Sequence, residues 1–103
     1  MKRGSTPTFT FEIPFDVSAI QSCFVTMKQT VGNKVVQIDK SKDQCVLQDK
    51  TISCDLTQED TLKFDAHRNA SVQLRVLTSG GKALVSNVFT VMVGKVLKEG
   101  VIE

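Results

Sequence analysis

The side chains that could carry catalysis are few in this sequence, and they form no recognisable motif. His67 is the only histidine, and it lies in the polar stretch 65–69. No serine or cysteine stands at a spacing that would tie it to this imidazole as a nucleophile to its base. We therefore interpret His67 as a solvated loop residue. We expect a protein that is not an enzyme and has no catalytic residues.

Three cysteines, Cys23, Cys45 and Cys54, could supply metal ligands or a disulfide. Their number is odd and their spacing irregular, whereas structural zinc sites take their ligands in close pairs. Cys23 and Cys54 each lie in a strand-like run, so we interpret both as small hydrophobic residues of the core. We expect no metal and no cofactor, and the free thiols favour a reducing compartment.

Two further patterns have ordinary structural interpretations. Gly80, Gly81 and Lys82 lack the glycine spacing and the following helix of a phosphate-binding loop, so they predict a hairpin turn. The neighbouring acids Glu59 and Asp60 are typical of the first turn of a helix, where backbone amides attract negative charge.

Composition indicates one folded domain. The 103 residues are 41% hydrophobic and 23% charged, with a net charge of +2, which is enough apolar surface for a core and argues against disorder. We expect a single domain over 1–103, with a flexible start at 1–6 and a peripheral tail at 95–103. Residues 4–8 are too polar for a signal peptide, so we expect no secretion by that route. No apolar run is long enough to span a membrane, so we expect no membrane partner.

Apolar residues recur at every second position in much of the chain, which indicates half-buried strands. Phe9, Phe11 and Ile13 predict the first strand. Two hairpins should follow. The first joins residues 23–29 to 34–38 through Val31, Gly32 and Asn33, and the second joins 44–47 to 51–56. A short helical turn near 57–61 follows, capped by Thr57, and residues 62–65 return to alternation.

The clearest alternation runs over residues 70–93. Val72, Leu74 and Val76 point to one side, a glycine turn at 79–81 follows, and the inward pattern then continues at Phe89, Val91 and Val93. The whole pattern predicts an all-β fold: an antiparallel β-sandwich, immunoglobulin-like or jelly-roll-like, with about seven short strands and at most one short helical turn.

A sheet protein without a catalytic motif can act through its surfaces, because edge strands carry free amides and carbonyls. We predict association through the first strand and the tail, with core packing as the alternative role of each apolar residue. The candidate residues are Thr8, Phe11, Ile13, Val96, Leu97 and Ile102. Nucleic acid is not the expected partner, because no basic stripe with exposed aromatic residues is evident. We expect no small-molecule substrate.

Several short segments resemble small structural proteins of phages and prophages of Gram-positive bacteria. They are the opening at 2–9, the segment 52–62 with its Leu-Thr-Gln-Glu-Asp turn, the strand at 72–76, and the ending at 93–102. The order of elements is similar to that of the amino-terminal β domain of phage baseplate upper proteins. The resemblance implies a building block of the virion or tail that packs against copies of itself or other structural proteins.

We therefore predict a non-enzymatic, virion-associated structural or assembly protein. Its expected partners are other virion structural proteins or itself, as a homo-oligomer. We expect it in the cytoplasm of the bacterial host or in the virion. The alternative is a small cytosolic binding module for nucleic acid or for a host protein.

Overall fold

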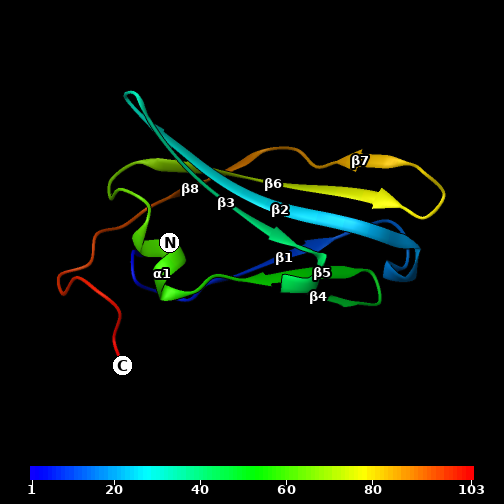
Figure 1. The fold of residues 1–103 in the computed structure, drawn as a ribbon, viewed down its shortest axis with the longest axis horizontal. Coiled ribbons are helices and arrows are strands. Elements are labelled where there is room, and N and C mark those ends of the chain that lie inside the picture. Colours follow the sequence, from blue (N-terminus) through cyan, green and yellow to red (C-terminus); the bar gives the residue numbers. More distant parts are fainter.

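The computed structural model describes residues 1–103 and arranges them as two antiparallel sheets packed against each other (Figure 1). The smaller sheet has the strand order β1-β5-β4, with bounds Thr8–Glu12, Thr51–Asp55 and Cys45–Gln48. The larger sheet begins β3-β2-β6, with bounds Lys34–Ser41, Ile20–Val31 and Asn69–Thr78. Two short strands, β7 (Ala83–Val85) and β8 (Phe89–Met92), pair in succession with the remaining edge of β6. The predicted antiparallel sandwich is confirmed.

Short helical segments carry the chain from one sheet to the other. Two are 3-10 turns, at Val17–Ala19 and Lys42–Gln44, and the third is the helix α1, Gln58–Leu62. Thr57 caps α1, because its hydroxyl accepts the Asp60 N–H at 3.1 Å while the Asp60 carboxylate accepts the Thr57 N–H at 2.9 Å. The helical turn expected near 57–61 is thus confirmed. No helix of the structure has the length and apolar character needed to cross a membrane.

The core lies between the sheets and is built from the residues whose alternation the sequence shows. Val72, Leu74 and Val76 are buried on β6, and Phe11 is buried on β1. Phe9, Ile13 and Val91 pack against them. Cys23 and Cys54 are buried, as predicted. Side chains of the two inner faces therefore fill the sandwich, while the alternate residues face outward.

The structure differs from the sequence expectation at residues 62–65. Alternation was expected there, but Lys63 donates its N–H to Asp60 O and Phe64 donates its N–H to Thr61 O. These bonds extend the last turn of α1, and they turn the Phe64 side chain into the core, where it is fully buried. A short helix can satisfy the same hydrophobic pattern as a short strand, so four residues did not distinguish the two.

The strand that follows the glycine turn is broken into β7 and β8 by residues 86–88. At the break, the Ser86 side chain takes over one hydrogen bond of the strand ladder. The Ser86 N–H donates to Leu74 O at 2.8 Å, but the Leu74 N–H donates to the Ser86 hydroxyl at 2.9 Å instead of to a backbone carbonyl. The Gln73 amide donates to Ser86 O at 3.0 Å. The interruption behaves as a bulge that keeps both strands on β6 but changes which residues face it.

Candidate protein-interaction surface

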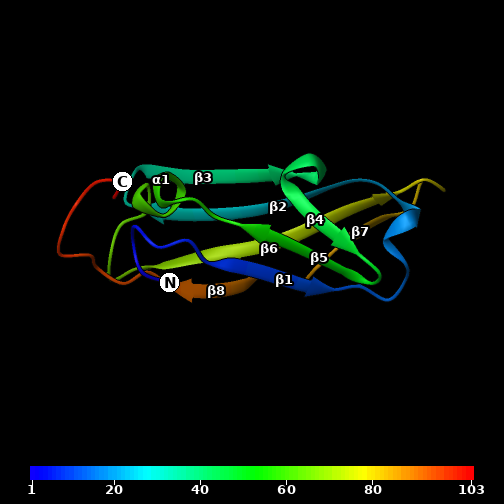
Figure 2. The ribbon, with the colours of Figure 1, turned by 90° about the horizontal axis from the view of Figure 1, so that it is seen from below.

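One side of the sandwich leaves a free strand edge on each sheet. Figure 2 shows β1 and β8 along the same side of the molecule, opposite β3. Pro7 O accepts the Leu56 N–H, and the Ile13 N–H donates to Lys50 O, so the backbone of Pro7 and Ile13 faces β5. By the alternation of a strand, the backbone groups of Thr8, Thr10 and Glu12 face away from β5. We call this region, formed by β1, β7, β8 and the groove between them, the open side.

An apolar groove of about 430 Å³ lies in the open side, between β1 with its continuation and the edge of β7. Phe11, Ile13 and Phe15 come from the β1 segment, and Leu74 and Val76 from β6. The remaining lining residues are Thr10, Glu12, Pro14, Leu84, Val85 and Ser86. Glu12 is the only charged residue among them, so the groove is suited to an apolar occupant.

Three phenylalanines close the sandwich next to this groove. The Phe89 ring of β8 lies 5.7 Å from the Phe11 ring and 6.5 Å from the Phe9 ring, measured between centroids. The second contact is edge to face, which is a favoured aromatic geometry. Phe89 thus joins the edges of the two sheets at one end of the open side, while the end near β7 remains a groove.

Exposed apolar side chains are concentrated on the same edge. Val85, Val88 and Met92 have exposed fractions of 56, 56 and 57%, and Leu84 and Phe89 are also exposed. Five large apolar side chains within a nine-residue stretch form a cluster, whereas single exposed ones are common on any protein surface. This cluster identifies the open side as a candidate contact surface.

The six residues predicted for association fall in two separate places. Phe11 is buried and, with Ile13, lines the groove. Thr8 lies at the start of β1, where its hydroxyl donates to Asp55 at 2.5 Å. Thr8 lines a second cavity with Val101 of the tail. This second cavity measures about 610 Å³ and has a largely polar lining that includes Asp55 and Glu59.

The tail lies against α1 and the start of the chain. The backbone N–H and C=O of Ile102 bond to the Gln58 side-chain amide at 2.8 and 3.1 Å. Arg3 forms an ion pair with Glu99, and Val96 lies near Gly4. Leu97 is 91% exposed. The tail is therefore held at several points, and its association role stays a prediction.

The three thiols gather between the sheets. Cys45 of β4 lies opposite Cys54 of β5 in the strand register, and it also neighbours Cys23 of β2. All three thiols are free. Burial raises the pKa of Cys23 and of Cys45 to about 11; Cys45 adds to the rise at Cys23, and Cys54 adds to the rise at Cys45. Burial also raises the pKa of Cys54. Because the thiolate is the nucleophile, these pKa values make all three cysteines poor nucleophiles at neutral pH.

His67 lies in an exposed turn with a positive φ of 64°. Its backbone N–H donates to Val93 O at 2.7 Å, so the turn is fixed by the chain rather than by the imidazole. No group of three His, Cys, Asp or Glu side chains is placed to hold one metal ion.

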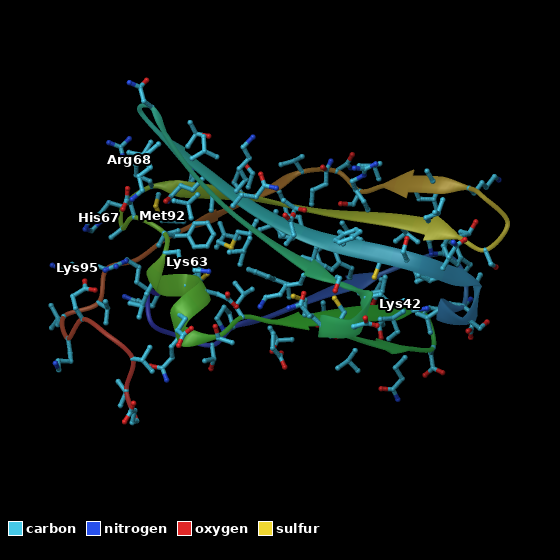
Figure 3. The ribbon with its side chains drawn as sticks, viewed as in Figure 1. Lys42, Lys63, His67, Arg68, Met92 and Lys95 are labelled. Carbon is cyan, nitrogen blue, oxygen red and sulfur yellow. The ribbon has the colours of Figure 1, made fainter.

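A group of basic residues occupies the end of the sandwich near α1. Figure 3 shows Lys63, His67, Arg68 and Lys95 toward this end. The ion pairs of the structure are formed by Arg3, Lys34 and Lys40. Lys63, Arg68 and Lys95 therefore have no carboxylate within the distance of an ion pair.

The alternation of the sequence did not reveal the exposed residues of the β7–β8 edge, because it predicts only an inward pattern for 89–93. A signal was available, because no charged residue occurs between Lys82 and Lys95. Such a run is ordinary in a central strand that is covered on both faces. Only the sheet order places this run at an edge.

No protein-family model matches the chain, and no curated protein or solved structure shows significant similarity to it.

Proposed function

We propose that this chain is a non-enzymatic assembly protein that acts through protein–protein contacts, with the open side as its main contact surface. The observation that carries the proposal is the apolar groove between β1 and β7, together with the exposed apolar edge beside it. When a partner covers water-exposed apolar surface of this kind, the free energy of the system falls, which favours association.

The kind of assembly follows from the resemblance of residues 2–9, 52–62, 72–76 and 93–102 to small phage structural proteins. We propose a component of a phage or prophage particle, such as a tail or baseplate, that is made in the cytoplasm of the bacterial host and is incorporated into the virion. Other structural proteins of the particle, or further copies of this chain, are the partners.

The test is incorporation into particles. Particles purified on a density gradient from the cells that encode the chain are expected to contain it, as detected by mass spectrometry. Leu84→Glu, which places a charge in the groove, is expected to reduce the incorporated amount at least tenfold. Val46→Glu, on the outer face of β4, is the control and should be incorporated normally. If this chain were abundant in the cells but missing from every particle fraction, the proposal would be contradicted.

The basic end supports a second candidate function, binding of a polyanion such as nucleic acid. Lys63, Arg68 and Lys95 provide cationic groups that form no ion pair, while the exposed side chain labelled beside them in Figure 3 is Met92 rather than an aromatic residue for stacking. Binding to single-stranded DNA should weaken steeply with salt and should be lost in Lys63→Gln/Lys95→Gln. Retention of the DNA by the double variant would exclude this end as the binding site.

A further inference from the structure

The outer edge formed by β7 and β8 is unusual because it lacks charge. Natural sheets protect their free edges with charged residues, often lysine, which disfavour pairing with another strand. Two of the other free edges of this protein follow that rule: β3 contains Lys34, Asp39 and Lys40, and β1 contains Glu12. The third, the four-residue strand β4, has no charge of its own but is flanked by Asp43 and Asp49. Residues 83–94 contain no charged side chain at all.

The hydrogen bonds of β8 show which backbone groups are free. Val93 bonds to His67 and Arg68, so it faces the β6 side. Met92 and Gly94 bond on the opposite side, to residues 1–3 of the chain's own start. By the alternation of an extended strand, Thr90 also faces away from β6 with both its N–H and its C=O. The chain's start thus closes the edge from Met92 onward, and the edge stays open around Thr90.

We propose that a second copy of this chain pairs with β8 in the antiparallel sense, with Thr90 opposite Thr90 of the second copy across a two-fold axis. The inference rests on the proposed assembly function and identifies the partner. Two residues that face each other in this way exchange both backbone hydrogen bonds. A two-fold contact brings a residue opposite its own copy at the axis, so an uncharged residue such as Thr90 at that position avoids repulsion between like charges.

The register assigns a partner to the most exposed side chains of the edge. With Thr90 opposite Thr90, Val88 of each copy lies opposite Met92 of the other, so the pairing displaces the Met1 ammonium that bonds to Met92 O in the single chain. Met92 is on the outer face with Thr90, since they pair with Asn69 and Ser71 of β6. Val88 and Met92 are both more than half exposed in the single chain, and the pairing would cover both.

The size of the face is sufficient for such a contact. The molecule measures 46 × 32 × 17 Å, and the side that carries β1 and β8 lies across the two longer dimensions (Figures 1 and 2). A stable interface buries roughly 800 Å² on each partner, which fits within this side. The neighbouring groove and Phe89 extend the apolar contact beyond the paired strands.

Analytical ultracentrifugation of the full chain tests the proposal. The wild type is expected to be a dimer. Thr90→Lys and Thr90→Glu should each raise the dimer dissociation constant at least tenfold, because like charges meet at the axis. An equimolar mixture of the two variants should recover the dimer as a heterodimer. Val35→Lys is the control, since Val35 is 54% exposed on β3, the opposite edge of the same sheet, and should dimerise like the wild type.

Circular dichroism of each variant establishes that the fold is retained. A dimer that is unaffected by both Thr90 variants would overturn the β8 contact while leaving an assembly function intact. A wild type that stays monomeric at every concentration would also overturn this inference. The assembly function would then be decided separately, by the presence of the chain in purified particles.

Discussion

At the scale of single residues, the ion pair of Lys40 and Asp60 links β3 to the first turn of α1. The Lys40 Nζ lies 2.7 Å from the Asp60 Oδ2, and both side chains are largely buried. Burial alone would raise the pKa of Asp60, but hydrogen bonds from Lys40 and Thr57 outweigh it and hold the pKa below 3.8. The charged carboxylate therefore stabilises the fold fully above pH 3.8, and this contribution is lost as the pH falls through the lower folded pKa.

Replacing Lys40 should be costly at neutral pH. Lys40→Met leaves a largely buried carboxylate without its cation, and we expect the free energy of unfolding to fall by about 3 kcal/mol. The control is Lys34→Met on the same strand, whose 3.9 Å pair with Asp65 is exposed and should contribute less than about 1 kcal/mol. Urea unfolding at pH 7 measures both. Repeated below pH 3.8, the Lys40→Met difference should narrow as Asp60 becomes protonated, and equal losses in the two variants would contradict the argument.

At the scale of elements, hairpin turns determine which strands become neighbours. Gly32 and Asn33 form the two-residue turn between β2 and β3, since Val31 pairs with Lys34. Gly32 has a φ of 60°, a left-handed conformation that glycine adopts without strain. An added Cβ would touch nothing within 4 Å, so the backbone conformation alone explains the need for glycine.

Gly32→Ala should therefore destabilise the protein by about 1 kcal/mol, the usual cost of placing an L-residue in the left-handed region. For a domain of this size the melting temperature should fall by about 4–8 °C. Gly80→Ala is the control, because the φ of Gly80 is not positive and the nearest neighbour of its added Cβ is at an ordinary 3.9 Å. Differential scanning calorimetry compares the two, and an equal fall in both would show that the turn geometry is not the cause.

At the scale of the whole molecule, the two sheets are joined by the core and, on the open side, by Phe89. Phe89 is 40% exposed, yet its ring contacts Phe9 and Phe11 of the other sheet. Phe24 is similarly exposed, at 47%, but it lies on the outer face of β2 opposite Arg75 and Ser41. Because Phe89 and Phe24 have the same side chain and similar exposure, comparing their substitutions separates the stability gained by joining the sheets from that of a large apolar side chain alone.

We expect Phe89→Ala to lower the free energy of unfolding by about 2 kcal/mol, through lost burial and lost aromatic contacts. Phe24→Ala should cost less than about 1 kcal/mol, because most of its ring is already in water. Urea unfolding monitored by far-ultraviolet circular dichroism measures both values. If Phe24→Ala were the more damaging variant, the role of Phe89 in joining the sheets would be refuted.

Local patterns in the sequence determined which residues face the core and where most strands turn. Val72, Leu74 and Val76 are buried because alternate side chains of a strand point to opposite faces, whatever its neighbours are. The cap of α1 by Thr57 and the turn at Gly32 are equally local, because their contacts lie within a few residues. The break at Ser86 is not local, since it depends on contacts with Gln73 and Leu74 of β6.

Only the tertiary structure decided which strands lie at the edges and what they meet there. A period of two assigns each residue to a face, but it carries no information about the neighbouring strand, because strand pairing depends on contacts between distant segments. The uncharged stretch 83–94 is thus recognisable in the sequence, yet it becomes a candidate contact surface only because β6 has no strand beyond β7 and β8. The pairing of Lys40 with Asp60 and the position of Phe89 beside β1 depend on the same long-range packing.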